Sequence, residues 1–247
     1  MTISERADAL EEIMSRHLDE LMAVKSVLFV SGDIEPKDVR TPPLSRGAKR
    51  YVMGDDPRLS KMPAKPTLAD FFTHRFMPAN HLLQSATHAL KAGQSEKIVM
   101  ACLLHDIAVI GFIRGDHGYW GAQLVEPYVD EEVSWAIRNH QALRFYADEA
   151  AGYAYPEAYV RNFGDAYTPE PYIEAAYKSA RNHKWYMSSR SITVHDIYSF
   201  DPNAVVNFDD FRDIIARNFK QPAEGLGLDD SPVAHMWRTM NRPTRFL

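Results

Sequence analysis

Histidine and aspartate recur in apolar surroundings along the middle of the chain. The chain contains ten histidines, and an adjacent pair, His105-Asp106, stands inside the aliphatic run LLHDIA. Burying an ionised carboxylate beside an imidazole without partners costs several kcal/mol. A metal ion would neutralise this carboxylate directly. The alternatives are a single buried ion pair and a polar site at a helix end.

Further candidate ligands lie on, or at the edge of, other expected elements, again among apolar residues: His81, His117, His140 and Asp196. Imidazole and carboxylate together suit divalent or trivalent first-row metals such as iron, manganese and zinc. Six such ligands exceed the four of a zinc site and suit two metals that share a bridging carboxylate. The single cysteine, Cys102, excludes an intramolecular disulfide and a zinc or iron–sulfur site built from cysteines.

The elements that carry these residues are expected to be helices. The ranges predicted as helical are Ser4–Val24, Asn80–Lys91, Glu96–Ile110, Gly118–Pro127, Glu131–Ala147, Pro171–Asp196 (long or broken), Phe208–Phe219 and Val233–Met240. Gly93 suits the end of one helix, and Ser95 can cap the start of the next. The helix from Glu96 is apolar nearly all round, so it should be the buried centre of an all-α bundle.

The N-terminal quarter of the chain differs from the rest. Ser26–Ser31 and Lys49–Met53 are short β-favouring runs that would pair as a hairpin, and Asp55–Pro66, with its three prolines, is typical of a connector. We therefore predict an N-terminal extension over residues 1–66 and a helical bundle over residues 67–247.

Composition narrows the class of protein. Of the 247 residues 45% are hydrophobic and 25% are charged, which excludes global disorder. The net charge of −5 argues against bulk nucleic-acid binding. No apolar run approaches the roughly 18–20 residues of a membrane span, and the acidic N-terminus lacks the apolar core of a signal peptide. We expect a cytoplasmic protein, which the unpaired cysteine also fits.

The order H…HD…H…H…D resembles the HD-domain superfamily. It is most similar to the mixed-valent diiron oxygenase branch, which includes the HD-type phosphonate oxygenases and, more distantly, myo-inositol oxygenase. The similar stretches are HLLQSA from His81, ACLLHDI from Ala101, HGYWGA from His117, VSWAIRNHQALRFY from Val133 and the late Asp196-Ile197-Tyr198. The resemblance covers roughly residues 80–201 and implies the helical fold of an HD domain.

The resemblance also implies a site and a reaction. One metal would be held by His81, His105, Asp106 and Asp196 and the second by His117 and His140, with Asp106 bridging the two. In this branch the metals are Fe(II) and Fe(III), the pair activates O2, and a small-molecule substrate chelates one iron before a C–H bond breaks. The implied reaction is oxidative cleavage at C–H and C–P or C–C bonds of a small anionic substrate such as an organophosphonate.

Two residues near these ligands bear on the substrate. Arg144 stands one helical turn after His140, where the phosphonate oxygenases carry a lysine, and a guanidinium binds phosphonate or carboxylate through paired hydrogen bonds. The alternative is an exposed helix arginine paired with a nearby carboxylate. Upstream, Phe71 and His74 replace the Tyr and Glu of some phosphonate oxygenases, which argues against an aminoalkylphosphonate. His74 is a candidate substrate-site residue that could reach the metal, and the alternative is a solvated loop histidine.

Two other classes of function stay open. A metal-dependent phosphohydrolase or phosphodiesterase would use the same ligands with Mn, Fe, Mg or Zn to activate water. A non-enzymatic domain with a structural polar cluster is the third class. The partners expected are a small-molecule substrate and O2, with no nucleic acid and no membrane. The arginine-rich segment His235–Leu247 would either cover the bundle or contact a second subunit in a homodimer.

Overall fold

The computed structural model describes residues 9–10, 13, 60–76, 79–109, 116–156, 159–160, 166–197, 199, 201–221, 236 and 240. Within these residues the secondary structure is helical, and the only β contact is an isolated antiparallel bridge between Asp148 and Tyr153. The prediction of an all-α bundle is confirmed. No helix in this part of the chain is long and apolar enough to cross a membrane.

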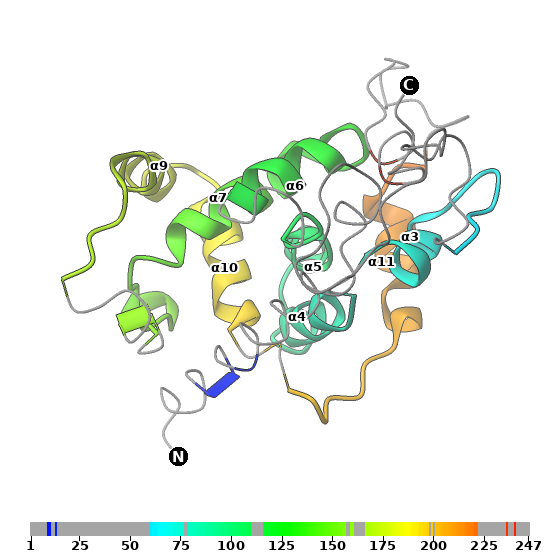
Figure 1. The fold of residues 1–247 in the computed structure, drawn as a ribbon, viewed down its shortest axis with the longest axis horizontal. Coiled ribbons are helices and arrows are strands. Elements are labelled where there is room, and N and C mark those ends of the chain that lie inside the picture. Colours follow the sequence, from blue (N-terminus) through cyan, green and yellow to red (C-terminus); the bar gives the residue numbers. More distant parts are fainter. Residues whose placement is uncertain are drawn as a thin grey trace, which may run out of the picture.

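The described α-helices are α3 (Leu68–His74), α4 (Ala79–Lys91), α5 (Glu96–Leu104), α6 (His117–Val125), α7 (Glu131–Leu143), α9 (Pro171–Arg181), α10 (Tyr186–Asp196) and α11 (Arg212–Asn218). There are also three short 3-10 helices among the described residues. The first, η2 (Glu126–Tyr128), follows α6; η3 (Glu149–Ala151) follows α7; and η4 (Phe208–Phe211) precedes α11. In Figure 1, α5 lies at the centre and packs against α4, α7, α10 and α11.

The central helix α5 is the apolar segment that the sequence predicts. The Ser95 side chain accepts a hydrogen bond from the amide of Ile98 and so caps the helix start. Side chains on all sides of α5 are buried, including Met100 and Leu103 at 0% exposure. The preceding helix ends as expected near Gly93, whose φ of 69° is a left-handed conformation that favours glycine.

The predicted end of this helix is wrong: α5 stops at Leu104, and residues 105–109 form a turn. Nδ1 of His105 donates to the carbonyl of Cys102 at 2.8 Å. In a continued helix that carbonyl would accept from the amide of Asp106. The amide of Val109 instead reaches the carbonyl of Asp106 at 3.0 Å, a three-residue step. His105 and Asp106 therefore stand in a turn that aims both side chains at one point.

The helix from Glu131 is shorter than predicted, and of the two alternatives for Pro171–Asp196 the broken one is observed. The helix from Glu131 ends at Leu143 rather than Ala147, because the guanidinium of Arg190 binds the carbonyls of Leu143 and Tyr146 at 3.0 Å each. The segment Pro171–Asp196 is broken, and residues 182–185 separate α9 from α10.

The N-terminal predictions fall mostly outside the described residues. Of the helix predicted over Ser4–Val24, only Ala9, Leu10 and Ile13 are described, and they are helical. The predicted hairpin runs, Ser26–Ser31 and Lys49–Met53, lie outside the described residues, as does Val233–Met240 apart from Met236 and Met240. The division at residue 66 stays a prediction.

Candidate metal centre

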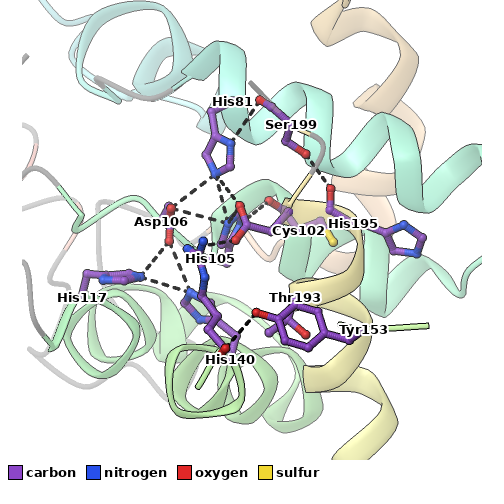
Figure 2. Close-up of polar contacts among 12 residues, drawn as sticks. His81, Cys102, His105, Asp106, His117, His140, Tyr153, Thr193, His195 and Ser199 are labelled. Atoms are coloured by element: carbon purple, nitrogen blue, oxygen red, sulfur yellow. Dashed lines mark hydrogen bonds and ion pairs between the residues drawn. The ribbon is translucent and has the colours of Figure 1, made fainter. Parts of the chain in front are cut away.

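Six side chains from five segments converge at a buried point at the end of α5, and Figure 2 labels all of them except Asp196. They come from α4, the turn after α5, the start of α6, the last turns of α7 and the end of α10: His81, His105, Asp106, His117, His140 and Asp196. The exposed fraction is 6% at His117 and 3% or less at the other five. The structure thus brings together all six residues that the sequence singled out.

Asp106 lies between two pairs of histidines. Its Oδ1 is 3.0 Å from Nε2 of His117 and 3.3 Å from Nε2 of His140. Its Oδ2 is 3.3 Å from Nε2 of His81 and 3.6 Å from Nε2 of His105. Each carboxylate oxygen therefore serves a different pair, which is the geometry of a bridging carboxylate.

The ligand atoms form two overlapping groups. One atom from each of His81, His105, Asp106 and Asp196 lies within 4.8 Å of the others, and the same holds for Asp106, His117 and His140. Asp196 completes the first group, with Oδ1 3.2 Å from Nε2 of His81 and 3.4 Å from Nε2 of His105. Asp106 belongs to both groups, so the site has the layout of two adjacent metal positions.

Backbone carbonyls fix the orientation of three of the rings. Nδ1 of His81 lies 3.3 Å from the carbonyl of Ser199, and Nδ1 of His140 lies 2.6 Å from the carbonyl of Ile137. His105 makes the corresponding contact with Cys102. A carbonyl only accepts, so each Nδ1 carries the proton, and a neutral ring then presents the lone pair of Nε2 to the centre. This is the tautomer that binds a metal through Nε2.

This arrangement leaves the centre short of donors. Nε2 of His81 lies 3.2 Å from Nε2 of His105, and Nε2 of His117 lies 3.2 Å from Nε2 of His140. Among the described residues, Oδ1 of Asp106 and both oxygens of Asp196 are buried without a hydrogen bond of good geometry, although ion-pair partners stand nearby. Imidazole lone pairs and ionised carboxylates therefore face one another in a buried space, and a cation between them would offset their repulsion. Imidazole nitrogens and carboxylate oxygens together fit first-row metals.

Protonation of His81 supplies part of that positive charge when no metal is bound. Burial by itself would lower the pKa of His81, but Asp106 and Asp196 outweigh it and raise the pKa to about 9. Burial would raise the pKa of Asp106, whereas the neighbouring His105 and His117 hold it well below its usual range. The carboxylates are therefore ionised at neutral pH, as metal ligands must be.

His140 behaves differently from His81. Burial lowers the pKa of His140 to about 4, despite the nearby carboxylate of Asp106. It is thus neutral across the physiological range. The pKa of Asp196 is also well below its usual range: burial opposes ionisation, and the charge of Arg144 together with the close imidazoles of His105 and His81 overcomes it.

The two predicted substrate residues lie in different places. Arg144 is 6% exposed, and its Nη1 is 3.1 Å from Oδ2 of Asp196, so the alternative of an exposed helix arginine is wrong. Its guanidinium also lies over the ring of Tyr159, 5.5 Å from the centroid. His74 is the last residue of α3 and belongs to neither metal-binding group of the described residues. Phe71 is fully buried in the core.

The other histidines near the motif do not join the cluster. His183 stacks on Trp135 with centroids 4.1 Å apart. His195 turns its ring away from Asp106 (Figure 2), and its backbone carbonyl accepts from the Ser199 hydroxyl at 2.6 Å. Cys102 is a buried core residue, and burial raises the pKa of its thiol to about 12.

Sequence reasoning missed the residues that support the ligands. Gln84 is buried and exchanges two hydrogen bonds with the backbone of Asp201, so it ties the segment after α10 to α4. The carbonyl of Ser199 in the same segment orients His81. Gly118 lets α6 approach the His140 ring closely, because a Cβ at this position would lie only 3.2 Å from the ring. The HGYWGA stretch carries this glycine, but its closeness to His140 is a tertiary contact.

Comparison with known families agrees with this arrangement. Residues 79–181 match the family model of the HD domain. The matched region carries five of the six clustered residues, and Asp196 follows it in the chain. A search of the curated proteins found no match. This stretch of the all-α bundle is therefore similar to an HD domain, and HD domains bind divalent metals.

Proposed function

We propose that the protein is a diiron oxygenase that uses an Fe(II)/Fe(III) pair and O2 to cleave C–H and C–P or C–C bonds of a small anionic substrate, such as an organophosphonate. The observation that carries the proposal is the position of Asp106, whose two oxygens serve separate histidine pairs. A carboxylate placed in this way supports two metals rather than one.

The protein residues in this proposal bind, orient and exclude water. When bound, the iron pair supplies O2 activation and the hard oxidative chemistry. His117 and His140 hold one position, and His81, His105 and Asp196 hold the other. Carbonyls behind three of the rings keep Nε2 directed inward. Burial keeps bulk water from the centre, which suits reactive oxygen chemistry.

Arg144 supports an anionic substrate. Its guanidinium stands at the edge of the centre, against Asp196. A phosphonate or carboxylate that approached the adjacent metal position would meet this guanidinium and form paired, charge-assisted hydrogen bonds. The aromatic ring of Tyr159 on the same guanidinium helps to hold it in place.

A metal-dependent phosphohydrolase is the second candidate, because the HD-domain match at residues 79–181 fits it equally well. The same ligands would hold Mn, Mg or Zn and lower the pKa of a bound water. The four histidines of the cluster favour iron, manganese or zinc over magnesium, which prefers oxygen ligands.

The test is metal analysis with low-temperature EPR on protein purified anaerobically and partly reduced. We expect about two irons per chain and a coupled half-integer-spin signal with g values below that of the free electron. His117→Ala should lose the coupled signal, whereas His183→Ala, outside the cluster, should keep it. Mn, Mg or Zn without this signal would favour the hydrolase. O2 uptake with phosphonates and polyols would then identify the substrate.

A further inference from the structure

The face of helix α7 that lies away from the candidate metal centre lines a cavity. His140 points inward, whereas Arg138 and Ala142, two positions to either side, point outward, since successive helical residues are about 100° apart. Between this outer face and helices α6 and α9 lies a cavity of about 450 Å³. Its size falls within the range of small-molecule sites, about 300–1,000 Å³.

The walls of this cavity are mainly aromatic and aliphatic. Tyr119 and Trp120 of α6, Phe145 after α7, and Tyr172 and Ile173 of α9 line it. Three of these rings are exposed, at 45% for Tyr119, 44% for Trp120 and 58% for Tyr172. Aromatic rings gathered around a hollow and left open to water are typical of a surface that binds a ligand.

The charges around the cavity favour a cation. Asp116 lines it, and within the described part of the chain its carboxylate makes no hydrogen bond or ion pair. Burial, and then the negative charges of Asp116 and Glu170, raise the pKa of Tyr172, so both carboxylates add negative potential at its hydroxyl. Aromatic faces add to the attraction for a positive charge.

Arg138, the positive group of the lining, is engaged by other residues. Its guanidinium lies over the Tyr119 ring, 5.3 Å from the centroid. The Gln123 amide makes two hydrogen bonds when its oxygen and nitrogen are exchanged. Its oxygen then accepts from the guanidinium of Arg138 at 3.1 Å, and its nitrogen donates to the carboxylate of Glu126 at 3.1 Å. Arg138 is thus held at the α6 wall, and Asp116 is the charged group of the lining that is left for a ligand.

We infer that this cavity binds an arylalkyl ammonium ion: an aromatic ring that packs against Trp120 and Tyr172, joined to a primary ammonium that donates hydrogen bonds to Asp116. The carboxylate favours a primary over a quaternary ammonium, because only the primary ion has N–H groups that can donate hydrogen bonds to it. The site does not depend on the proposed oxygenase activity. The cavity adjoins the candidate metal centre through Gln141, which is one of its lining residues. The Gln141 side chain accepts a hydrogen bond at 3.4 Å from the amide of Gly118, the residue after His117.

The probe for this site is 2-phenylethylammonium, titrated into the full-length protein by calorimetry and by tryptophan fluorescence. We expect saturable binding of one ion per chain. Neutral 2-phenylethanol and anionic 3-phenylpropionate should each bind at least about tenfold more weakly, as the loss of one charge-assisted hydrogen bond requires. Equal binding of either compound, or no saturation by the ammonium, would overturn the inference.

Variants assign the binding to this cavity. Asp116→Asn should weaken 2-phenylethylammonium about tenfold or more and leave 2-phenylethanol unchanged. Glu149→Gln, which removes an exposed carboxylate outside the cavity, should change neither. Trp120→Phe should abolish the fluorescence response while calorimetry still detects binding. Ala142→Phe should fill the cavity and block binding, with circular dichroism as the check on folding. Unchanged affinity in both Asp116→Asn and Ala142→Phe would place the binding elsewhere.

Discussion

Arg144 and Asp196 form a buried ion pair at the edge of the candidate metal centre. Nη1 of Arg144 lies 3.1 Å from Oδ2 of Asp196, and the two side chains are 8% and 1% exposed. The other oxygen of Asp196 faces His81 and His105. The guanidinium therefore occupies one oxygen of this carboxylate and leaves the other for a metal. This division favours ligation through a single oxygen and keeps the carboxylate ionised.

Arg144→Gln should weaken the metal position that contains Asp196 by about 10- to 100-fold, the usual effect of removing a residue that orients a ligand. Arg144→Lys should lose less, because it keeps the charge but not the planar fork. Competition with a chromogenic chelator measures the affinity. Arg212→Gln, which removes an exposed arginine paired with Asp209, is the matched control. Wild-type affinity in Arg144→Gln would show that the ion pair does not support the site.

Asp106→Ala should remove both metals, because each metal position depends on one of its oxygens. His140→Ala should remove one metal and leave the group of His81, His105, Asp106 and Asp196 able to bind the other. Metal counting by mass spectrometry on the same preparations distinguishes the two results. Asp106→Ala protein that still carried two metals per chain, or that turned over fully, would exclude the bridging role.

The sequence predicts the centre better than its surroundings, for a physical reason. Imidazole and carboxylate groups in apolar segments need a common partner, so their types and order indicate a shared site. The end of α5 was not predictable, because the apolar pattern continues to Ile110 while His105 and Asp106 turn toward ligands from other segments. The pairing of Arg144 with Asp196 joins positions far apart in sequence, so no local pattern encodes it.

The metal-free protein should lose stability as the pH rises from about 6.5 to 9, through the titration of His81. Its pKa rises from 6.5 to about 9 on folding, so the stabilisation is complete below the unfolded value and disappears above the folded one. His140 has the opposite effect: its pKa falls to about 4 on folding, so its titration lowers the stability as the pH falls below about 6.5. Urea unfolding at a series of pH values measures this dependence.

His81→Gln should flatten that dependence between pH 6.5 and 9, the interval set by the shift of the His81 pKa, whereas His183→Gln should not. Metal binding at neutral pH should also release a proton from His81, since the metal and the proton compete for Nε2. Calorimetry in two buffers of different ionisation enthalpy detects the release. A pH-independent stability of the wild-type protein over this interval would contradict the assignment.

Gly118→Ala should disturb the metal position of His117 and His140. The added Cβ would stand 3.0 Å from the carbonyl of Ile137 and 3.2 Å from the His140 ring, so α6 must move away from α7. We expect a loss of about 1–3 kcal/mol in stability and weaker binding of one metal. Gly121→Ala in the same helix is the control, since its nearest neighbour is 3.4 Å away and alanine favours the helix. Equal effects of the two substitutions would refute the argument.

Arg190 holds α7 and α10 together beneath the ion pair of Arg144 and Asp196. It is fully buried and donates to the carbonyls of Leu143 and Tyr146 at 3.0 Å and to the Tyr186 hydroxyl at 3.0 Å. These carbonyls end α7, where a positive charge is favourable. Because Arg144 directly follows α7 and Asp196 is the last residue of α10, the same contacts set the spacing of the ion pair.

Arg190→Met should therefore destabilise the fold by about 3–5 kcal/mol, because it removes the charged donor from the carbonyls of Leu143 and Tyr146 and from the Tyr186 hydroxyl at once. Arg190→Lys should recover only part of this loss, since one ammonium cannot reach groups that the planar guanidinium spans. Arg181→Met, which removes a half-exposed arginine from the Tyr186 ring, should cost less than about 1 kcal/mol. Urea unfolding gives the three values. If Arg190→Met were no more destabilising than Arg181→Met, the junction of α7 and α10 would have to be held by its apolar contacts alone, and Arg190 would not set the distance between Arg144 and Asp196.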